Sequence, residues 1–357
     1  MKRFLAVAGS TLGLLLLALA LFFLWASSGR LPEEALAQTK RYAAAPATAG
    51  DTLTVTTYNI GYLSGMTNNE PVVRSDSFLA ANLERALALL READPDLVGF
   101  QEIDYGAARS GYTQQLDTIA ARLGYAAAAQ AVNWDERYLP FPYGRPAVHF
   151  GRTLSGQAVL SRLPVRAHRR VVLARPPQSF VRDAFYLDRL AQVAVLDLGG
   201  RALAVVNVHL EAFDAATRER QARTVNRLYD RLAAQGLPVL LIGDFNSTLP
   251  HAAGGAADTT DRTMRLLLAD TDLRPVFPDT SAAAAPGTYP ADAPTRPIDH
   301  IFYPPGRLAV VDRRVQCGAP SPPSDHCAVT ASFRRSDSAA AGPAPDALPS
   351  LDTLLAE

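Results

Sequence analysis

Hydrophobic and polar residues follow two different periods along the middle of the chain. Leu79, Leu83, Leu87 and Leu90 recur at helical spacing, and residues 112–123 and 214–234 show the same kind of pattern. Alternating or continuously apolar runs instead predict strands at residues 53–58, 96–100, 156–161, 191–198, 202–210, 238–242, 298–303 and 327–333. Gly199 and Gly200 predict a hairpin turn between two of these strands. This mixture of elements predicts mixed sheets in a layered α/β domain.

The N-terminus carries a long uncharged apolar run. Lys2 and Arg3 precede residues 4–26, a run long enough to cross a bilayer as a helix of roughly 20 residues. Trp25 would lie at the membrane interface, and the two cations place the start of the chain in the cytoplasm. A cleaved secretory signal is the alternative, because Ala35-Leu36-Ala37 resembles a cleavage site. Both interpretations export the remainder of the chain, either membrane-anchored or secreted.

Composition divides the chain into four parts. Residues 1–29 form the anchor or signal segment, and residues 30–50 have the proline and alanine content of a linker. Residues 51–335 hold the predicted catalytic domain, and residues 336–357 are expected to be a disordered tail, although residues 348–355 could form a short helix. We expect a monomer.

The overall composition is that of a folded and neutral protein. Of the 357 residues, 48% are hydrophobic and 20% charged, which allows a sizeable core. Lys and Arg total 35, as do Asp and Glu, so the net charge gives no general attraction to nucleic acid. The two cysteines, Cys317 and Cys327, could close a disulfide in an oxidising compartment or remain unpaired buried thiols.

Residues 133–145 are dense in aromatic side chains and arginine. They could form a substrate-facing loop or a loop packed on the domain by its own rings. Arg189, near a strand start, could reach a functional site or form a surface ion pair.

Polar side chains stand at the ends of the predicted strands. One such residue alone is typical of a cap or a turn. Here six segments place carboxylate, amide or imidazole groups at strand edges, namely Asn59, Glu102, Asn207 with His209, Asp244 with Asn246, Asp299, and Asp325 with His326. A hard cation prefers carboxylate oxygens, and a phosphoryl group accepts hydrogen bonds from Asn and His.

In their order along residues 53–333, these segments resemble the endonuclease/exonuclease/phosphatase superfamily of deoxyribonuclease-like, Mg²⁺-dependent phosphoesterases. The motifs that carry the resemblance are Thr57-Tyr58-Asn59-Ile60, Asp96-Leu97-Val98-Gly99-Phe100-Gln101-Glu102, Ser155-Gly156-Gln157-Ala158-Val159-Leu160-Ser161, Asn207-Val208-His209-Leu210, Gly243-Asp244-Phe245-Asn246, Ile298-Asp299-His300-Ile301 and Ser324-Asp325-His326. One departure is His300, which stands where many members carry Tyr or another aromatic residue. The resemblance implies a four-layer α/β sandwich of two mixed β-sheets, preceded here by one N-terminal transmembrane helix.

The resemblance also implies a role for each polar residue. Glu102 would be the principal ligand of Mg²⁺, or of Mn²⁺, with Asn59 beside it and Asp325 helping to hold metal or water. The catalytic groups would be His209, Asp244, Asp299 and His326. Asp299 would orient His326, Asp244 would orient or deprotonate water, and His209 would bind phosphate or serve the leaving group. Asn207 and Asn246 would hold phosphate oxygens.

Three functions share these residues. The first is a phosphodiesterase or phosphatase acting outside the cytoplasm and tethered by the N-terminal helix. The second is an exported or tethered endonuclease, which the net charge of zero does not support. The third is an inactive binding module on the same fold, which the complete polar set argues against.

Overall fold

The computed structural model of the protein describes residues 2–47, 50–68, 70–142, 144–249, 261–278, 286–335 and 342–355. Its strands are β1 (Ala37–Arg41), β2 (Thr52–Asn59), β3 (Leu97–Asp104), β4 (Ala127–Leu139), β5 (Gly151–Ser161), β6 (Val165–Val172), β7 (Leu190–Asp197), β8 (Ala202–His209), β9 (Val239–Asp244), β10 (Arg274–Pro275), β11 (Asp299–Tyr303), β12 (Leu308–Gln316) and β13 (Ala328–Arg335). Its α-helices are α1 (Lys2–Ala26), α2 (Asp76–Ala93), α3 (Gln115–Leu123), α4 (Phe180–Asp183), α5 (Ala215–Ala234), α6 (Thr263–Leu267) and α7 (Leu351–Leu354).

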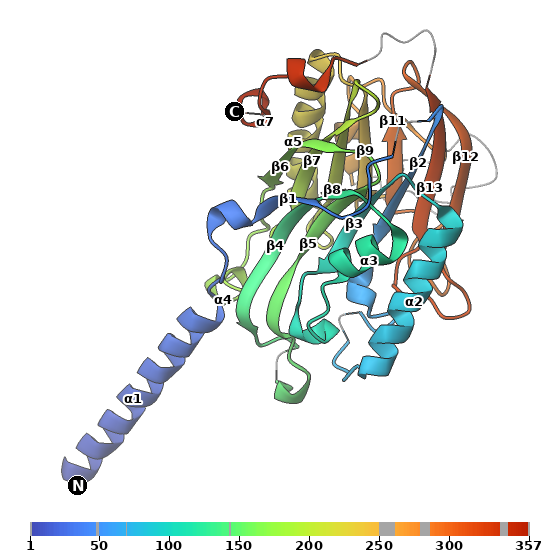
Figure 1. The fold of residues 1–357 in the computed structure, drawn as a ribbon. Helices are drawn as coiled ribbons and strands as arrows, with labels where there is room; N and C mark the ends of the chain where they lie inside the picture. Colours follow the sequence, from blue (N-terminus) through green and yellow to red (C-terminus); the bar gives the residue numbers. More distant parts are fainter. Residues whose placement is uncertain are drawn as a thin grey trace.

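The strands form two mixed sheets (Figure 1). A seven-stranded sheet has the order β1-β4-β5-β3-β2-β13-β12, and a six-stranded sheet has the order β10-β11-β9-β8-β7-β6. In each sheet one central pair is parallel, β2 with β3 and β8 with β9, while the other pairs are antiparallel. The carboxyl ends of β2 and β3, and those of β8 and β9, therefore point the same way within their sheets.

Apolar side chains from both sheets meet in a common core. Every second residue of a strand faces the same side, and this face carries, among others, Val55, Leu97 and Val159 in one sheet and Val205 and Ile242 in the other. Gly99 lets the sheets come close, because a Cβ atom there would lie 2.5 Å from Cδ1 of Ile242.

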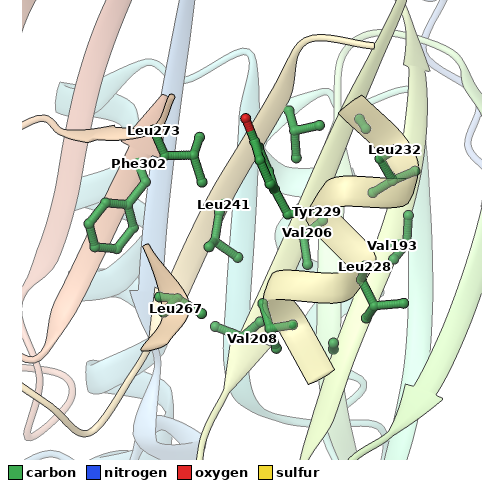
Figure 2. Packing of buried hydrophobic residues seen from close by; sticks show 14 of the residues in the cluster. Val193, Val206, Val208, Leu228, Tyr229, Leu232, Leu241, Leu267, Leu273 and Phe302 are labelled. Carbon is green, nitrogen blue, oxygen red and sulfur yellow. The ribbon is translucent and has the colours of Figure 1, made fainter. Parts of the chain in front are cut away.

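Helices cover the outer faces of both sheets. On the six-stranded sheet, Leu228, Tyr229 and Leu232 of α5 pack against strand residues such as Val206 (Figure 2). On the seven-stranded sheet, α2 and α3 contribute Leu87, Leu90, Leu116 and Ile119, among others, to a third cluster. The result is the four-layer α/β sandwich that the resemblance implies.

The helix α1 projects from the domain (Figure 1). It is long and apolar enough to cross a membrane, and a signal sequence would pass the same test. Only its last turn is packed: Ala26 is buried and Phe23 contacts a cluster that contains Trp134, Phe150 and Phe185. Trp134, Tyr138 and Phe141 of the 133–145 segment thus pack against their neighbours and the end of α1.

The structure differs from the sequence prediction at both ends of the domain. Within the predicted linker, β1 pairs antiparallel with β4 and adds a strand to the sheet. In the predicted tail, the short helix expected as an alternative for residues 348–355 is present as α7, and its Leu351 is buried against the six-stranded sheet and α5. Apolar burial explains the order there. The remaining tail residues, 336–341 and 356–357, lie outside the described residues.

Candidate active site

Ends of strands from both sheets place the predicted polar residues next to one another. Asn59 ends β2, His209 ends β8 and Asp244 ends β9, and all three are buried. Glu102 lies in β3 at a shift of register with β5, and its φ of 51° is the left-handed conformation that non-glycine residues rarely adopt. Such strain persists where surrounding contacts hold it, commonly at functional sites.

Asp244 is the centre of the cluster. Its Oδ2 atom accepts a hydrogen bond of 3.0 Å from Nδ2 of Asn59. The same oxygen lies 3.4 Å from Nε2 of His209 and 3.8 Å from Nε2 of His326. Burial, followed by the nearby charge of Asp299, raises the pKa of Asp244, so its carboxylate is more basic than an exposed one.

His326 is held by a buried carboxylate. Its Nδ1 atom donates to Oδ2 of Asp299 over 2.9 Å, and its Nε2 atom lies 3.4 Å from Nδ2 of Asn59. Burial opposes a charge on the ring, but Asp299 and Asp244 outweigh it and raise the pKa of His326 well above its ordinary value. These two carboxylates thus favour the charged form of the His326 imidazole beside the cluster.

His209 has the opposite electrostatic environment. Arg189, which is buried, donates from Nη1 to Nε2 of His209 over 2.5 Å. Arginine has no acceptor, so this contact places the imidazole proton on Nδ1. Burial and then Arg189 lower the pKa of His209 well below its ordinary value. Nε of Arg189 also lies 3.7 Å from Oε2 of Glu211. Because Arg189 is buried and contacts His209, it belongs to this cluster and does not form a surface ion pair.

Two carboxylates converge on the other side of the cluster. Asn68 donates from Nδ2 to Glu102 over 2.9 Å and to the two oxygens of Asp325 over 3.3 and 3.4 Å. Burial, opposed by His326 and assisted by Glu102, raises the pKa of Asp325 to about 6. Gly61 leaves room here, because a side chain at this position would place a Cβ atom 2.7 Å from Oδ1 of Asp325. Repelling carboxylates in a confined space fit a divalent cation.

A second group of donors could also hold a metal ion. Asp244, Asp299 and His326 offer atoms within 4.8 Å of one another. In this group, however, His326 already neutralises Asp299 through their direct contact. Glu102 and Asp325 have only the neutral amide of Asn68 between them, so we favour these two carboxylates as the place for a cation.

Asn59 and Asn246 both support Asp244. The carbonyl oxygen of the Asn59 side chain accepts from the Gly61 N–H group, while its amide donates to Asp244. The Asn246 backbone N–H group donates to Oδ1 of Asp244, and its side chain donates to the carbonyl of Leu210. Metal binding by Asn59 and phosphate binding by Asn246 stay predictions.

Asn207 lies between the sheets instead of in the site, which disagrees with the predicted phosphate contact. Its Nδ2 atom donates to the carbonyls of Phe100 and Ala158 and to Oε1 of Gln192. Its Oδ1 atom accepts from Gln101 over 2.6 Å. With no exposed surface and every amide hydrogen engaged, Asn207 joins the sheets and does not face substrate.

The loop that contains Asp325 and His326 is closed by a disulfide between Cys317 and Cys327. This bond decides between the two interpretations of the cysteines. His300, the departure from the family pattern, is buried against Phe245 and Phe302 and contacts the Ser247 carbonyl over 3.1 Å. It therefore occupies a packed aromatic position, as an aromatic residue would.

Asn68 is a residue of the site that the sequence did not indicate. No pattern distinguishes it, because it lies in an irregular segment after β2 and reaches Glu102 only through the fold. Its one available signal was its position in the connection that follows Asn59.

Comparison with known proteins agrees with the fold and the motifs. The model of the Endonuclease/Exonuclease/phosphatase family matches residues 56–326, well over half of the chain. The chain therefore belongs to the endonuclease/exonuclease/phosphatase family, whose members are hydrolases of phosphate esters.

Individual relatives are more distant. The inositol phosphosphingolipids phospholipase C of Saccharomyces cerevisiae (strain ATCC 204508 / S288c) is 33% identical over 126 residues, 31% of this chain and 26% of that protein. The chain thus matches about a quarter of the length of this curated relative. The solved catalytic domain of human Nocturnin, with bound sulfate, is 17% identical, with a TM-score of 0.57 and coverage of 86% of this chain and 99% of that one.

A mannosyl-6-phosphatase structure from Bacteroides thetaiotaomicron VPI-5482 is 19% identical, with a TM-score of 0.52 and coverage of 79% of this chain and 99% of that one. At these identities the two structures establish the fold alone.

Proposed function

We propose that the protein is a Mg²⁺-dependent phosphodiesterase or phosphatase that acts outside the cytoplasm. The observation that carries this proposal is the convergence of Glu102 and Asp325 around Asn68, beside the cluster of Asp244, His209 and His326. Oε1 of Glu102 lies 3.9 Å from Nε2 of His209, so the carboxylate pair and the cluster form one site.

Glu102 and Asp325 would hold the metal ion. When bound, Mg²⁺ neutralises charge on the phosphate oxygens and on the leaving oxygen; Mn²⁺ would supply the same chemistry. The confined pair of carboxylates fits such an ion, and the raised pKa of Asp325 reflects burial and the charge of its neighbour Glu102.

The surrounding side chains divide the remaining work. Asp244, basic for a carboxylate, orients the attacking water and accepts its proton; a positioned base contributes about 10²–10⁴-fold. His326, held as a cation by Asp299, donates to a phosphate oxygen and stabilises the charge that develops there. His209 and Arg189 lie on the side of Glu102, where they contact the phosphate or its leaving group.

The N-terminus and the disulfide support the proposed site of action. The apolar helix α1 begins with Lys2 and Arg3, and cations at this end favour a domain on the side opposite the cytoplasm. Disulfides persist mainly in oxidising compartments, and the Cys317–Cys327 bond is consistent with that location. We propose that α1 remains attached as an anchor.

A substrate panel tests the proposed function. The full chain, purified in detergent, is incubated with nucleic acid, nucleotide, sugar phosphate and phospholipid esters, with Mg²⁺ and with EDTA. Hydrolysis of at least one ester, abolished by EDTA and restored by Mg²⁺, is the expected result. Preference for nucleic acid would favour the endonuclease alternative, and no hydrolysis of any ester would favour the inactive binding module.

A further inference from the structure

The end of α1 is attached to the domain without a free spacer. The Arg137 N–H group donates to the Ser28 carbonyl over 3.1 Å. Oδ2 of Asp135 accepts hydrogen bonds of 2.8 Å from the backbone N–H groups of Arg30 and Leu31. Arg152 in turn pairs with Asp135. A membrane that surrounds α1 therefore begins at the surface of the domain, in a fixed orientation.

Aromatic contacts locate that surface. Phe23, in the last turn of α1, lies 5.3 Å from the ring of Phe180 and 5.5 Å from that of Phe185. Phe22 lies 5.9 Å from Tyr138. Figure 1 shows α1 extending from the end of the domain where α4 lies, away from the end that carries α7.

The candidate catalytic site lies toward the same end of the domain. Phe185 is followed by Tyr186, which donates to Glu211 over 2.8 Å. Glu211 lies beside Arg189, which contacts His209. A short series of contacts thus connects the end of α1 with the catalytic histidine.

Large apolar side chains are exposed on connections that follow the strands of the site and on α4, which lies next to the end of α1. We call Val73, Tyr112, Phe180, Val181 and Phe213 the apolar rim. Phe213 is 90% exposed and Phe180 74% exposed. Such exposure is unusual for an aromatic ring in water and marks an interaction site when it is repeated locally.

The chain places the rim on the connections that carry the catalytic groups. Val73 follows Asn68 in the connection after β2, and Tyr112 lies in the connection after β3 and Glu102. Phe213 comes four residues after His209, and its N–H group donates to Oε1 of Glu211. By contrast, exposed Val172 and Val311 lie in β6 and β12, the outermost strands of the two sheets.

We propose that the apolar rim docks on the bilayer that contains α1, so that the site opens onto the membrane surface and acts on the phosphate ester of a lipid headgroup. The proposal rests on the proposed function for its chemistry and on the attachment of α1 for its geometry. Aromatic rings are favoured at the membrane interface, where their apolar bodies leave water. A docked rim would present lipid headgroups to Asp244 and His326 without extracting the lipid.

A fluorescent probe tests the docking independently of catalysis. Because the two natural cysteines are joined, Phe213→Cys introduces a single free thiol that can carry a nitrobenzoxadiazole dye. Val311→Cys is the matched control on the outer strand. In phosphatidylcholine vesicles containing the full chain, the dye at 213 should shift its emission to shorter wavelength and be quenched by a lipid-borne nitroxide. The dye at 311 should do neither; equal behaviour at the two positions would overturn the docking.

Turnover tests the substrate class. Rates are measured on a phospholipid in the same vesicles and on bis(p-nitrophenyl) phosphate in solution. For Phe180→Ser/Phe213→Ser, the ratio of the lipid rate to the soluble-ester rate should fall about tenfold, equivalent to ~1.4 kcal/mol. Val172→Ser/Val311→Ser should keep the wild-type ratio. An unchanged ratio in the rim variant would refute the lipid substrate.

The two measurements separate this inference from the proposed function. If the dye at position 213 remains in water while the soluble ester is hydrolysed with Mg²⁺, the docking alone would be overturned. A membrane-buried dye with no hydrolysis of either ester would overturn the catalytic proposal and leave the docking in place.

Discussion

The pKa values of two histidines at the site are shifted in opposite directions because their neighbours differ. Asp299 and Asp244 raise the pKa of His326 against the effect of burial, whereas burial and Arg189 lower the pKa of His209. One imidazole is thus a donor to anionic oxygen, and the other is neutral. Such separation of titrating groups is typical of acid–base catalysis at neutral pH.

Glu102→Gln removes one of the two carboxylates that face each other across Asn68. We expect kcat/KM for phosphate-ester hydrolysis to fall by about 10²–10³-fold, because the cation loses a charged ligand where the transition state needs it. Steady-state kinetics at several Mg²⁺ concentrations measure the loss.

Glu84→Gln is the control for that variant, since Glu84 forms a surface pair with Arg122 on the helical layer. It should keep the wild-type rate. A wild-type rate in Glu102→Gln would remove Glu102 from the metal site.

His300 predicts a pH dependence of stability. Burial lowers its pKa to about 4, below the ordinary value of 6.5. Between these values the unfolded chain binds a proton that the folded chain does not. The contribution of His300 to the free energy of unfolding is therefore fully present above pH 6.5 and is lost as the pH falls toward 4. Lowering the pH from 7 to 5 should lower the free energy of unfolding by roughly 2 kcal/mol through His300.

His300→Phe should remove that contribution while the packing against Phe245 and Phe302 is kept. Urea unfolding at pH 7 and pH 5, for wild type and variant, measures the difference. An equal loss of stability in both proteins would show that His300 is not the group that titrates.

Some residue assignments could be made from sequence and others could not. The strand-end motifs predicted Glu102, Asp244, Asp299 and His326, and the fold brings these residues together, while their catalytic roles stay predictions. The place of Asn207 between the sheets could not be predicted, because the sequence does not distinguish a buried amide between sheets from an amide that binds phosphate.

At the level of elements, the disulfide closes the connection between β12 and β13, and this connection carries Asp325 and His326. For a loop of sequence separation 10, the loss of loop-closure entropy in the unfolded chain corresponds to about 2–3 kcal/mol. Cys317→Ser/Cys327→Ser should lower the free energy of unfolding by this amount and lower turnover as well.

Denaturant unfolding and kinetics on the double variant, compared with reduced wild type, test this prediction. Equal stability and turnover with and without the bond would mean that neighbouring packing alone positions Asp325 and His326.

Strands were predicted where β-branched residues alternate or run together, as in β2, β7, β8 and β9. The omitted strands lack that signal. In β4 the run of Ala127, Ala128 and Ala129 favours a helix by intrinsic propensity, and the pairing with β5 overrides it. The omitted β12, an edge strand, carries charged residues that suit its exposure.

At the scale of the whole molecule, a polar network fixes the sheets relative to each other. Gln101 and Gln157 bond to Asn207 from the opposite sheet, and Gln192 bonds to it from the neighbouring strand of its own sheet. Because the site takes Glu102 from one sheet and His209 from the other, a shift between sheets would separate its members.

Asn207→Ala should therefore lower the free energy of unfolding by about 2–4 kcal/mol, since partners in both sheets lose a buried bond. Its turnover should fall along with stability. Asn246→Ala, the comparison variant beside Asp244, should lower turnover with little effect on unfolding. Thermal denaturation and kinetics on both distinguish the roles; a stable but inactive Asn207→Ala would restore its phosphate-binding assignment.

The central claim is that one cation site, formed by ends of the chain's strands and loops, prepares a phosphate ester for attack. The most direct measurement is the anomalous scattering of Mn²⁺ in crystals of the full chain. We predict a peak within about 2.0–2.3 Å of carboxylate oxygens of both Glu102 and Asp325. A peak held by Asp244, Asp299 and His326 without Glu102, or no peak in the cluster, would contradict the account.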